Sequence, residues 1–372
     1  MVQLPPGVER YQDIWDPANP AMLMPAEIFW QDHQKWLESV GYMLRPRYRP
    51  GWVPSWKGPN IIRYDFEDGQ SLRYRQLMDA TRISDGAMVA LKTVEANVHP
   101  YEIEIAKFLS SEPLRSDPRN HCVPVYDVIR VPDTADTFLL VMPFLRRYDS
   151  PKFDTIGECI DFFTQIFEGL QFMHDHLVAH RDCCDNNIMM DPTAMYPKLF
   201  HPASSDKNLD FSGTAKHYTR TERPPRYLLI DFGLSRRYLS KDRPILEDPI
   251  RGGDKSVPEF QAYDDPCDPF PTDVYYIGNL IREEFIQRHF GFDFMQSLVE
   301  AMVHVEPAKR PTMNEVVARF DSICRTMSTT QLRARVARRN ELSIVSGWRN
   351  MVHVARCCYY SLRRLPPSSS LQ

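Results

Sequence analysis

A short loop within residues 176–191, HLVAHRDCCDNNIMMD, constrains this chain more than any other feature. Apolar residues flank the loop on both sides and predict two short buried strands that fix it in place. Asp182 and Asn187 are separated by four residues, so a carboxylate and a carboxamide can face one small volume. This pair suits phosphoryl transfer, because the carboxylate orients a hydroxyl while the amide oxygen holds Mg²⁺ without adding a second full charge.

The residues His180, Arg181, Asp182 and Asn187 reproduce the pattern H-R-D-x-x-x-x-N. With this loop and further motifs in the same order across residues 70–325, the chain resembles the eukaryotic protein kinases. The resemblance implies an α+β, two-lobed protein-kinase-like fold, in which a small antiparallel β lobe carries one helix and a larger lobe is mostly α-helical. A looser likeness, in the HRDC loop, a long insertion and an RPRYRPGW leader, is to the divergent kinase-like proteins of mushroom-forming basidiomycete fungi.

Composition excludes several classes of protein. The chain has 372 residues, of which 43% are hydrophobic and 25% charged, as in an ordinary folded protein of two lobes or domains. The net charge of −4 gives no support to nucleic-acid binding. No apolar run is long enough for a transmembrane segment and no leader pattern is present, so an intracellular location, cytoplasmic or nuclear, is expected. The eight cysteines lack zinc-ligand spacing and are predicted to be free thiols.

Four segments are predicted along the chain. They are an N-terminal helix with a Pro-, Arg- and Trp-rich strap (1–60), a kinase-like β lobe reaching to the hinge (61–145), a kinase-like α lobe (146–330) and a basic tail (331–372). The strap is expected to pack across a domain surface, with a peptide-binding or membrane-contacting arm as the alternative. The tail is expected to pack on the α lobe or to be solvated, and contact with a membrane surface is the less favoured alternative.

Secondary structure is predicted from the apolar patterns. Helices are expected from Pro25 to Gly41 and over residues 156–176, and residues 192–226 are expected to form a polar surface-loop insertion. Strands are predicted at IIRYDF, SLRYRQLMDATRI, AMVALKTV, CVPVYDVIRV and TFLLVMPFL, with turns at Glu67-Asp68-Gly69 and Ser84-Asp85-Gly86.

Two charged residues are predicted to form a pair. Lys92 lies in the apolar string VALK, where a lysine is costly unless an anion such as a nucleotide phosphate or a helix glutamate meets it. Glu102 shares a helical face with Ile105, Ala106 and Leu109 and is therefore expected to point inward at Lys92. The alternatives are an edge lysine and a solvent-facing glutamate. By resemblance, this is the kinase lysine–glutamate pair that places the α- and β-phosphates.

The resemblance also assigns the nucleotide and metal sites. It makes Met142 the gatekeeper residue, with the backbone of Pro143 and Leu145 facing adenine. Asp231, in the string YLLIDFG, follows a buried strand and is expected to hold Mg²⁺ together with Asn187, while Gly233 supplies backbone freedom.

Three further residues are expected to have structural roles. By resemblance, Glu259 of the string VPE pairs with Arg310, and Asp273 holds the backbone of the catalytic loop. A buried charge of this kind needs its partner to offset desolvation.

The chain departs from the kinase pattern in places that bear on activity. The string SLRYRQLMDA has no glycine where kinases have a glycine-rich phosphate loop. Cys184 stands where Ser/Thr kinases have a lysine that meets the γ-phosphate, and Gly252 or Gly253 stands where a threonine bridges that lysine to the aspartate.

The favoured function is ATP- and Mg²⁺-dependent phosphoryl transfer to Ser/Thr hydroxyls of a protein substrate. Asp182 would orient the hydroxyl, and Arg181 is included among the catalytic residues. A phosphate on Ser240 or Ser256 that pairs with Arg181 is a further hypothesis. The alternatives are a pseudokinase scaffold, which the missing glycines favour, and a small-molecule kinase, which would not explain the string VPE or the late arginine.

Overall fold

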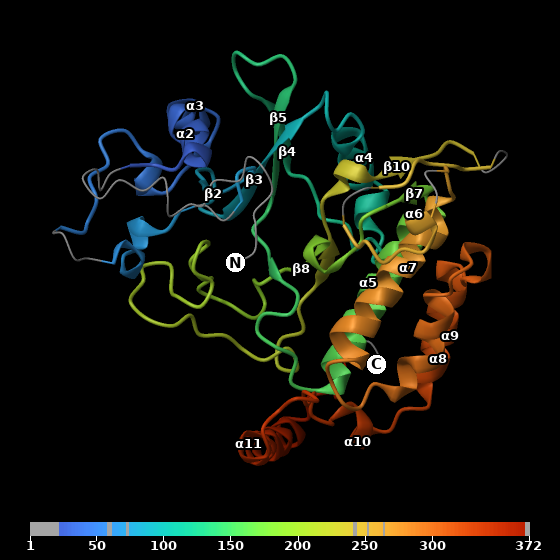
Figure 1. The fold of residues 1–372 in the computed structure, drawn as a ribbon. Coiled ribbons are helices and arrows are strands. Elements are labelled where there is room, and N and C mark those ends of the chain that lie inside the picture. Colours follow the sequence, from blue (N-terminus) through green and yellow to red (C-terminus); the bar gives the residue numbers. More distant parts are fainter. Residues whose placement is uncertain are drawn as a thin grey trace. The chain divides into compact units, whose positions relative to one another are not determined.

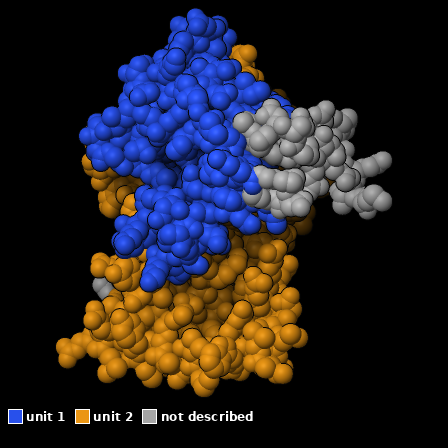
Figure 2. All heavy atoms as spheres, turned by 90° about the vertical axis from the view of Figure 1, so that its left-hand side faces the viewer, with its two compact units in different colours: residues 1–94, 126–144, 196–217 blue, residues 95–125, 145–195, 218–372 orange. Residues whose placement is uncertain are grey.

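The computed structural model describes residues 22–57, 62–71, 74–240, 244–250, 253–262 and 265–368. The chain divides into two compact units (Figure 2). Unit 1 comprises residues 1–94, 126–144 and 196–217, and unit 2 comprises residues 95–125, 145–195 and 218–372. Both units contain helices and strands, so the predicted α+β class is confirmed. Gly252 and the two ends of the chain, 1–21 and 369–372, lie outside the described residues.

Unit 1 is organised around a five-stranded sheet with the strand order β1-β2-β3-β5-β4 (Figure 1). The pairs β1–β2, β2–β3 and β4–β5 are antiparallel. The hairpin between β2 and β3 turns at Gly86, whose φ of +72° favours glycine, so the turn predicted there is confirmed. The strands are β1 Tyr42–Met43, β2 Leu77–Arg82, β3 Met88–Glu95, β4 Asp127–Arg130 and β5 Thr137–Pro143.

One face of this sheet is covered by two short helices, α2 (Pro25–Asp32) and α3 (Gln34–Ser39). They replace the single helix predicted from Pro25 to Gly41, because the helix is interrupted at His33. Both helices contribute fully buried side chains to the core of unit 1. The buried members of that core are Leu23, Trp30, Leu37, Tyr42, Leu44, Tyr48, Met78, Ala80, Val89, Leu91, Val131, Leu139 and Val141.

The arginine- and tryptophan-rich strap enters the core of unit 1 instead of lying on its surface. Arg47 is buried in the 3-10 turn η1 (Pro46–Tyr48) and donates to both oxygens of Glu27, at 3.0 and 2.9 Å. Tyr48 donates a third hydrogen bond to Glu27 at 2.8 Å. Burial alone would raise the pKa of Glu27, but the hydrogen bond and charge of Arg47 lower it below the ordinary value. Glu27 is therefore a buried, paired carboxylate.

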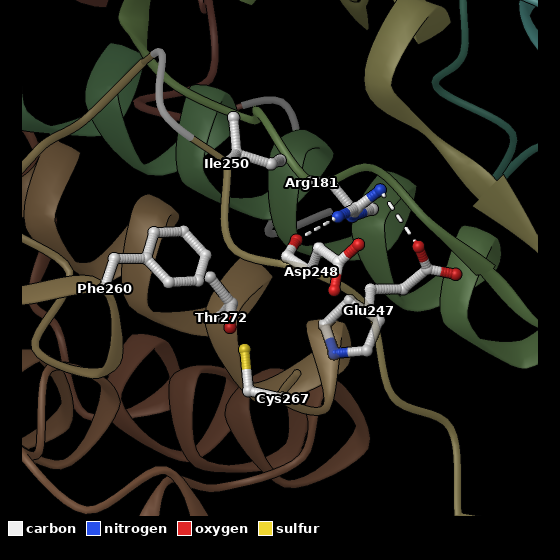
Figure 3. Close-up of a pocket in the computed structure, with 8 residues that line it drawn as sticks. Arg181, Glu247, Asp248, Ile250, Phe260, Cys267 and Thr272 are labelled. Atoms are coloured by element: carbon white, nitrogen blue, oxygen red, sulfur yellow. Dashed lines mark hydrogen bonds and ion pairs between the residues drawn. The ribbon is translucent and has the colours of Figure 1, made fainter. Parts of the chain in front are cut away.

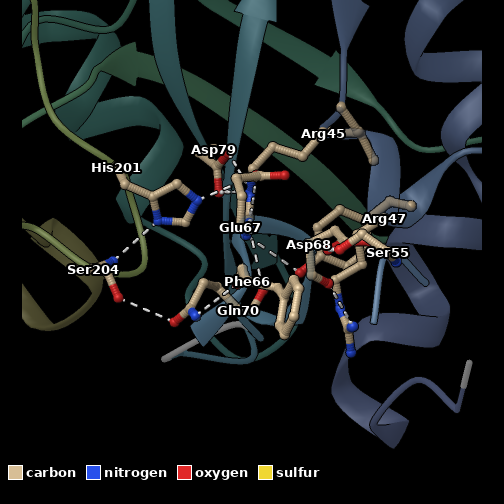
Figure 4. Close-up of polar contacts among 12 residues, drawn as sticks. Arg45, Arg47, Ser55, Phe66, Glu67, Asp68, Gln70, Asp79, His201 and Ser204 are labelled. Atoms are coloured by element: carbon tan, nitrogen blue, oxygen red, sulfur yellow. Dashed lines mark hydrogen bonds and ion pairs between the residues drawn. The ribbon is translucent and has the colours of Figure 1, made fainter. Parts of the chain in front are cut away.

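The strand predicted at IIRYDF is absent, and this prediction is wrong for its described residues. They contain the 3-10 turn η2 (Arg63–Asp65), and the 3-10 turn η3 (Glu67–Gly69) follows directly (Figure 4). The carboxylate of Asp68 explains the difference, because it accepts hydrogen bonds from the Trp52 indole at 3.0 Å and from the backbone N–H of Ser55 at 2.9 Å. These local bonds stabilise a compact turn in place of a strand ladder.

The insertion at 192–226 contains no helix or named strand, as predicted, but it is not merely a surface loop. His201 is 1% exposed and its Nε2 lies 3.2 Å from the Glu67 carboxylate (Figure 4). Ser204 donates to the side-chain oxygen of Gln70 at 3.0 Å. These contacts make residues 196–217 an integral part of unit 1.

Unit 2 is mostly helical and is centred on α5, which spans Ile156–Asp175 and confirms the helix predicted there (Figure 1). Fourteen of its twenty residues are buried, and Phe167 packs edge-on against Phe320 of α9 at 5.1 Å. The helices of unit 2 are α4 Glu102–Leu109, α5 Ile156–Asp175, α6 Glu259–Ala262, α7 Pro269–Ile281, α8 Gln296–Met302, α9 Met313–Arg325, α10 Thr329–Leu332 and α11 Ser343–Leu362.

Short strands enclose the predicted catalytic loop on both sides. β7 (Val178–Ala179) precedes it and pairs with β10 (Arg236–Arg237). β8 (Ile188–Met190) follows it and lies between β6 (Arg146–Arg147) and β9 (Tyr227–Leu229). The two buried strands predicted to fix the loop are therefore confirmed.

The remaining turns are short. They are the 3-10 turns η4 Leu114–Ser116, η5 Asp185–Asn187, η6 Phe232–Leu234, η8 Asp293–Met295 and η9 Pro307–Lys309, and the π-helical turn η7 Arg282–Ile286. All eight cysteines lie in described residues and are free thiols, as predicted. Within the described part of the chain, we find no helix with the length and apolar character needed to cross a membrane.

Candidate functional site

The backbone of the predicted catalytic loop in unit 2 is held by one buried carboxylate. Asp273 of α7 is fully buried and accepts hydrogen bonds from the backbone N–H groups of His180 at 2.8 Å and Arg181 at 2.7 Å. Arg181 has a φ of +68°, which is uncommon outside glycine and must be stabilised by its surroundings. The role expected for Asp273 is therefore confirmed.

Asp182 and Asn187 lie in contact, as the sequence predicted. The Nδ2 group of Asn187 donates to the backbone carbonyl and to the Oδ2 atom of Asp182, both at 2.8 Å. Because two acceptors of Asp182 fix the amide nitrogen of Asn187, the orientation of the amide is determined. Its oxygen points away from these two acceptors. The loop thus carries one oriented carboxylate and one oriented amide.

The second carboxylate oxygen of Asp182 is in an unusual environment. Oδ1 is buried and has no hydrogen-bond partner among the described residues. Burial raises the pKa of Asp182, and the nearby Asp231 carboxylate adds to the rise, whereas the electrostatic interaction with the His180 ring and the hydrogen bonding of Cys184 and Asn187 oppose it. The folded protein therefore holds an incompletely satisfied carboxylate at the centre of the site, which is costly unless the site uses it.

Gly253 covers this oxygen. Its φ of +68° favours glycine, and an ideal Cβ at this position would lie 2.4 Å from Oδ1 of Asp182. No larger residue fits there without displacing one of the two groups. In this conformation, a substrate hydroxyl can reach Oδ1 only if the backbone at Gly253 moves.

The Asp231 turn lies next to the start of α4. Asp231 adopts a left-handed conformation with φ of +66°, and its Oδ1 accepts from the backbone N–H of Gly233 at 3.3 Å. An ideal Cβ on Gly233 would lie 3.2 Å from Asp231 Oδ1 and 3.2 Å from Oε2 of Glu102. A side chain at residue 233 would therefore be tight against both carboxylates. The residue of this turn that has a positive φ is Asp231, and not Gly233, where backbone freedom was predicted.

Glu102 is buried on the helical face predicted for it. It opens α4 and is 2% exposed, and the other buried residues of the helix are Ile105, Ala106 and Leu109. A solvent-facing Glu102 is therefore excluded. His99, which the sequence did not single out, lies just before α4 and has its Nδ1 3.1 Å from the carbonyl of Gly233.

His180 connects the two aspartate turns. Its Nδ1 accepts from the backbone N–H of Asp182 at 3.3 Å, so Nε2 is the nitrogen that donates to the carbonyl of Ile230 at 3.1 Å. A direct backbone bond from Ile230 to the carbonyl of Asn187, at 2.9 Å, joins the same segments. Asp182, Asn187 and Asp231 are thereby fixed relative to one another within unit 2.

The side chain of Arg181 makes contacts that are separate from those of the Asp182 carboxylate. Its guanidinium lies 3.2 Å from Oε2 of Glu247 and donates to the carbonyl of Asp248 at 2.7 Å (Figure 3). Glu247 also accepts from the hydroxyl of Tyr238 at 3.0 Å, and Arg236 lies 3.6 Å away. Sequence reasoning missed Glu247, because no spacing rule distinguishes it among the acidic residues that follow the Asp231 turn.

Two cavities of unit 2 do not include Asp182 among their lining residues. One, beside Arg181, measures about 10 Å³, the space of one water molecule (Figure 3). A larger hollow of about 410 Å³ is lined by residues of α5, α7 and α9 and includes none of the predicted site residues. The candidate site is thus defined by side-chain geometry, because Gly253 covers the carboxylate that a substrate would approach.

A second buried ion pair supports the segment that leads into α6. Both guanidinium nitrogens of Arg310 donate to the carboxylate of Glu259, at 2.7 and 2.6 Å. The side chains of Arg310 and Glu259 are 0% and 10% exposed. The pairing expected from the resemblance is therefore present, with the two-pronged geometry that stabilises such pairs most.

The remaining predicted residues are divided between the units. Lys92 lies on β3 and Met142 and Pro143 on β5, all in unit 1, whereas Leu145 belongs to unit 2. Lys92 is half-buried and stands on the face of β3 opposite Leu91. The predicted pair of Lys92 with Glu102 and the predicted adenine contacts stay predictions.

Cys184 gives the site no positive charge. Burial and the neighbouring Asp182 carboxylate raise the pKa of this thiol to about 12. Cys184 is therefore a neutral thiol at physiological pH.

The donor set around Asp182 fits a divalent cation that is held partly by phosphate oxygens. Within the described residues, no group of three or more His, Cys, Asp and Glu side chains has the arrangement of a complete metal site. Mg²⁺ typically takes only one or two protein carboxylates and completes its shell with water and phosphate. Asp231 and the amide oxygen of Asn187 would supply that smaller set. The carboxylates of Asp182 and Asp231 are close enough to repel each other, and a bound cation would offset this repulsion.

Comparisons of this chain with protein-family models and with curated proteins find no match.

Proposed function

We propose that this chain is a divergent protein kinase with a two-lobed fold, which transfers a phosphoryl group from Mg²⁺-bound ATP to Ser or Thr hydroxyls of a protein. The observation that carries this proposal is the environment of Asp182. Its carboxylate is fixed by Asn187, is adjacent to Asp231, and keeps one buried oxygen without a hydrogen-bond partner among the described residues. Structural carboxylates such as Asp273 are saturated with donors, whereas a carboxylate kept for a substrate is not.

Each residue has a distinct task in this proposal. Asp182 accepts a hydrogen bond from the substrate hydroxyl and orients its oxygen toward the phosphorus. Asn187 and Asp231 would hold Mg²⁺, which neutralises phosphate charge when bound. Lys92, positioned by Glu102, would bind the α- and β-phosphates. Met142 and the backbone of Pro143 and Leu145 would contact adenine.

Arg181 acts in this proposal by positioning rather than by touching substrate. Its backbone is fixed by Asp273 and its guanidinium by Glu247 and Asp248. Because Arg181 directly precedes Asp182, these contacts set the direction of the carboxylate. The Glu247 carboxylate is already the ion-pair partner of Arg181, which is the role that the phosphoserine hypothesis gave to a phosphate.

Two features imply slow transfer. The neutral Cys184 thiol cannot stabilise the charge on the transferred phosphoryl group as a lysine would. Gly253 covers Oδ1 of Asp182, so the segment that contains it must move before a hydroxyl can bind. The same two features favour the second candidate, a scaffold that binds nucleotide without transferring phosphate.

Nucleotide-dependent stabilisation tests the proposal. The unfolding temperature of the wild type is measured with and without Mg²⁺-ATP and compared with that of Asp231→Ala. Ligand at about 100 times its dissociation constant stabilises a protein by about 2.7 kcal/mol, which corresponds to a rise of about 3–4 °C for a chain of this length. The wild type should show this rise and Asp231→Ala should show little or none.

Asp321→Ala is the matched control, because it removes an exposed carboxylate from α9. This variant should respond to Mg²⁺-ATP as the wild type does. If the wild type is not stabilised by Mg²⁺-ATP, or if Asp231→Ala is stabilised equally, the proposed metal and nucleotide site is wrong.

A further inference from the structure

The C-terminal helix α11 (Ser343–Leu362) is amphipathic with its faces reversed from the usual order: its polar side packs on the protein and its apolar side faces solvent. At 3.6 residues per turn, side chains seven positions apart lie along one line of the helix. Ser346, His353 and Tyr360 form such a line, in which Tyr360 is buried and Ser346 and His353 are half-buried.

The contacts of this inner line are polar. His353 Nε2 lies 2.8 Å from the carbonyl of Arg333, and the hydroxyl of Tyr360 donates to Thr219 at 2.9 Å. Ser346 accepts from Arg335 at 3.1 Å. The helix is thus attached to unit 2 through hydrogen bonds, which leaves its apolar residues available.

The outer side of α11 is apolar over its whole length. Ile344 is 89% exposed, Trp348 63%, Met351 59% and Leu362 84%. These four, together with Ala355 and Cys358, are spaced alternately by four and three residues, which places them on one face. The face is widened by the exposed residues Val352, Val354 and Tyr359. Soluble surfaces rarely leave a continuous apolar strip of this kind uncovered.

One border of this face is positively charged. Arg349, Arg356 and Arg363 are seven residues apart and follow the apolar face along the helix. Residues 331–368 contain eight arginines and no lysine, and Glu341 is the only acidic residue among them. Glu341 is already paired with Arg335 and Arg349, both at 2.5 Å. Hydrogen bonds from Arg335 and Arg349 lower the pKa of Glu341 to about 2, so it stays ionised in that pair.

From this arrangement we infer that α11 binds the surface of a membrane that contains anionic lipids. Its apolar face would enter the boundary between headgroups and acyl chains, with Trp348 and Tyr359 at that boundary. Arg349 and Arg356 already pair with Glu341 and Asp154. The exposed Arg363 and Arg364 would therefore be the arginines that bind phosphate and carboxylate headgroups. A second copy of α11 would bring another arginine border and no free acidic residue among residues 331–368, so its charge is not complementary. The apolar face spans about half of the helix circumference. Packing against one other helix would cover only the centre of this face and leave its two edges exposed.

Vesicle co-sedimentation of the full chain tests this inference. The protein is mixed with vesicles of phosphatidylcholine containing 30% phosphatidylserine, and with pure phosphatidylcholine. We expect the protein to bind the anionic vesicles at least tenfold more strongly than the neutral vesicles. Its binding to the anionic vesicles should weaken as salt is added. The double variant Trp348→Ser and Met351→Ser should lose binding at least tenfold, and Arg363→Gln with Arg364→Gln should reduce it on anionic vesicles only.

Leu239→Ser is the matched control, because Leu239 is 92% exposed in unit 2 but lies outside α11. It should bind vesicles like the wild type. All variants change exposed side chains, so their unfolding temperatures should match that of the wild type, which separates lost binding from lost folding. The inference is overturned if the wild type does not bind vesicles, or if the Trp348 and Met351 double variant binds them as strongly as the wild type does. It is also overturned if sedimentation velocity shows a wild-type dimer that is absent in the double variant while neither protein binds vesicles.

Discussion

Replacement of Asp182 by Asn is expected to stabilise the protein, although it removes the group on which the proposed activity depends. The pKa of Asp182 is raised, chiefly by burial, so the folded protein holds this proton more tightly than the unfolded chain does. The ionised carboxylate therefore costs stability at neutral pH. Asn keeps the oxygen that accepts from Asn187, while removing the charge and its repulsion from Asp231.

The size of the effect follows from the charge, because an Asn would place an NH₂ group at the Oδ1 position and leave that position without a partner among the described residues. Each unit of pKa difference between the folded and the unfolded state corresponds to about 1.4 kcal/mol. Because the Asp182 side chain is only half-buried, we expect a gain of about 1 kcal/mol, or a rise of about 1–2 °C in the unfolding temperature of a chain of this length. The gain should be full above the raised folded pKa and vanish as the pH falls toward the ordinary value of 3.8.

Asp273→Asn is the matched control with the opposite sign. Asp273 accepts from two backbone N–H groups, and an Asn would turn an NH₂ group toward one of them. This variant should lose about 2–4 kcal/mol. Both variants are compared with the wild type by thermal and urea unfolding at pH 7 in EDTA. If Asp182→Asn destabilises the protein as Asp273→Asn does, Asp182 is a structural carboxylate and our account of the site fails.

Three further perturbations address the segment after Asp231. Glu259→Gln should lower the free energy of unfolding by about 3–5 kcal/mol, because Arg310 is fully buried and would lose its charged partner; a loss under 1 kcal/mol in urea unfolding would contradict this. Burial alone would raise the pKa of Glu259, but the Arg310 hydrogen bond and charge lower it, so the deficit should be complete above pH 4.5 and shrink as the pH falls through the lowered folded pKa. Glu247→Gln should cost about 1.5–3 kcal/mol by the same assay, since Arg181 loses a charged acceptor. Alanine at both Ser240 and Ser256 should leave phosphoryl transfer within about twofold, and a larger loss would restore the phosphoserine hypothesis.

The sequence predicted those parts of the fold that follow from local periodicity. The helix at 156–175, the strands on either side of the catalytic loop and the inward face of Glu102 all depend on apolar spacing, which is visible in the chain. The pairings of Asp273 and Glu259 were expected from family resemblance, because long-range partners leave no local pattern.

The errors arose where a distant or polar partner decides the structure. The residues of IIRYDF alternate like a strand, but Asp68 gathers donors from Trp52 and Ser55 and favours turns. The insertion looked like a surface loop because its composition is polar, yet His201 is buried against Glu67. Glu247 was missed for the same reason, since its partners lie 66 and 11 residues away along the chain at Arg181 and Arg236.

Transfer of radiolabelled phosphate from Mg²⁺-[γ-³²P]ATP to a degenerate Ser/Thr peptide library tests the central claim most directly. The wild type should transfer slowly and Asp182→Asn should not transfer. Cys184→Lys, which places a cation beside Asp182 where the wild type has a neutral thiol, should raise the rate about tenfold or more. If the wild type and Cys184→Lys both fail to label any peptide while Mg²⁺-ATP still stabilises them against unfolding, the chain binds nucleotide as a scaffold and is not a kinase.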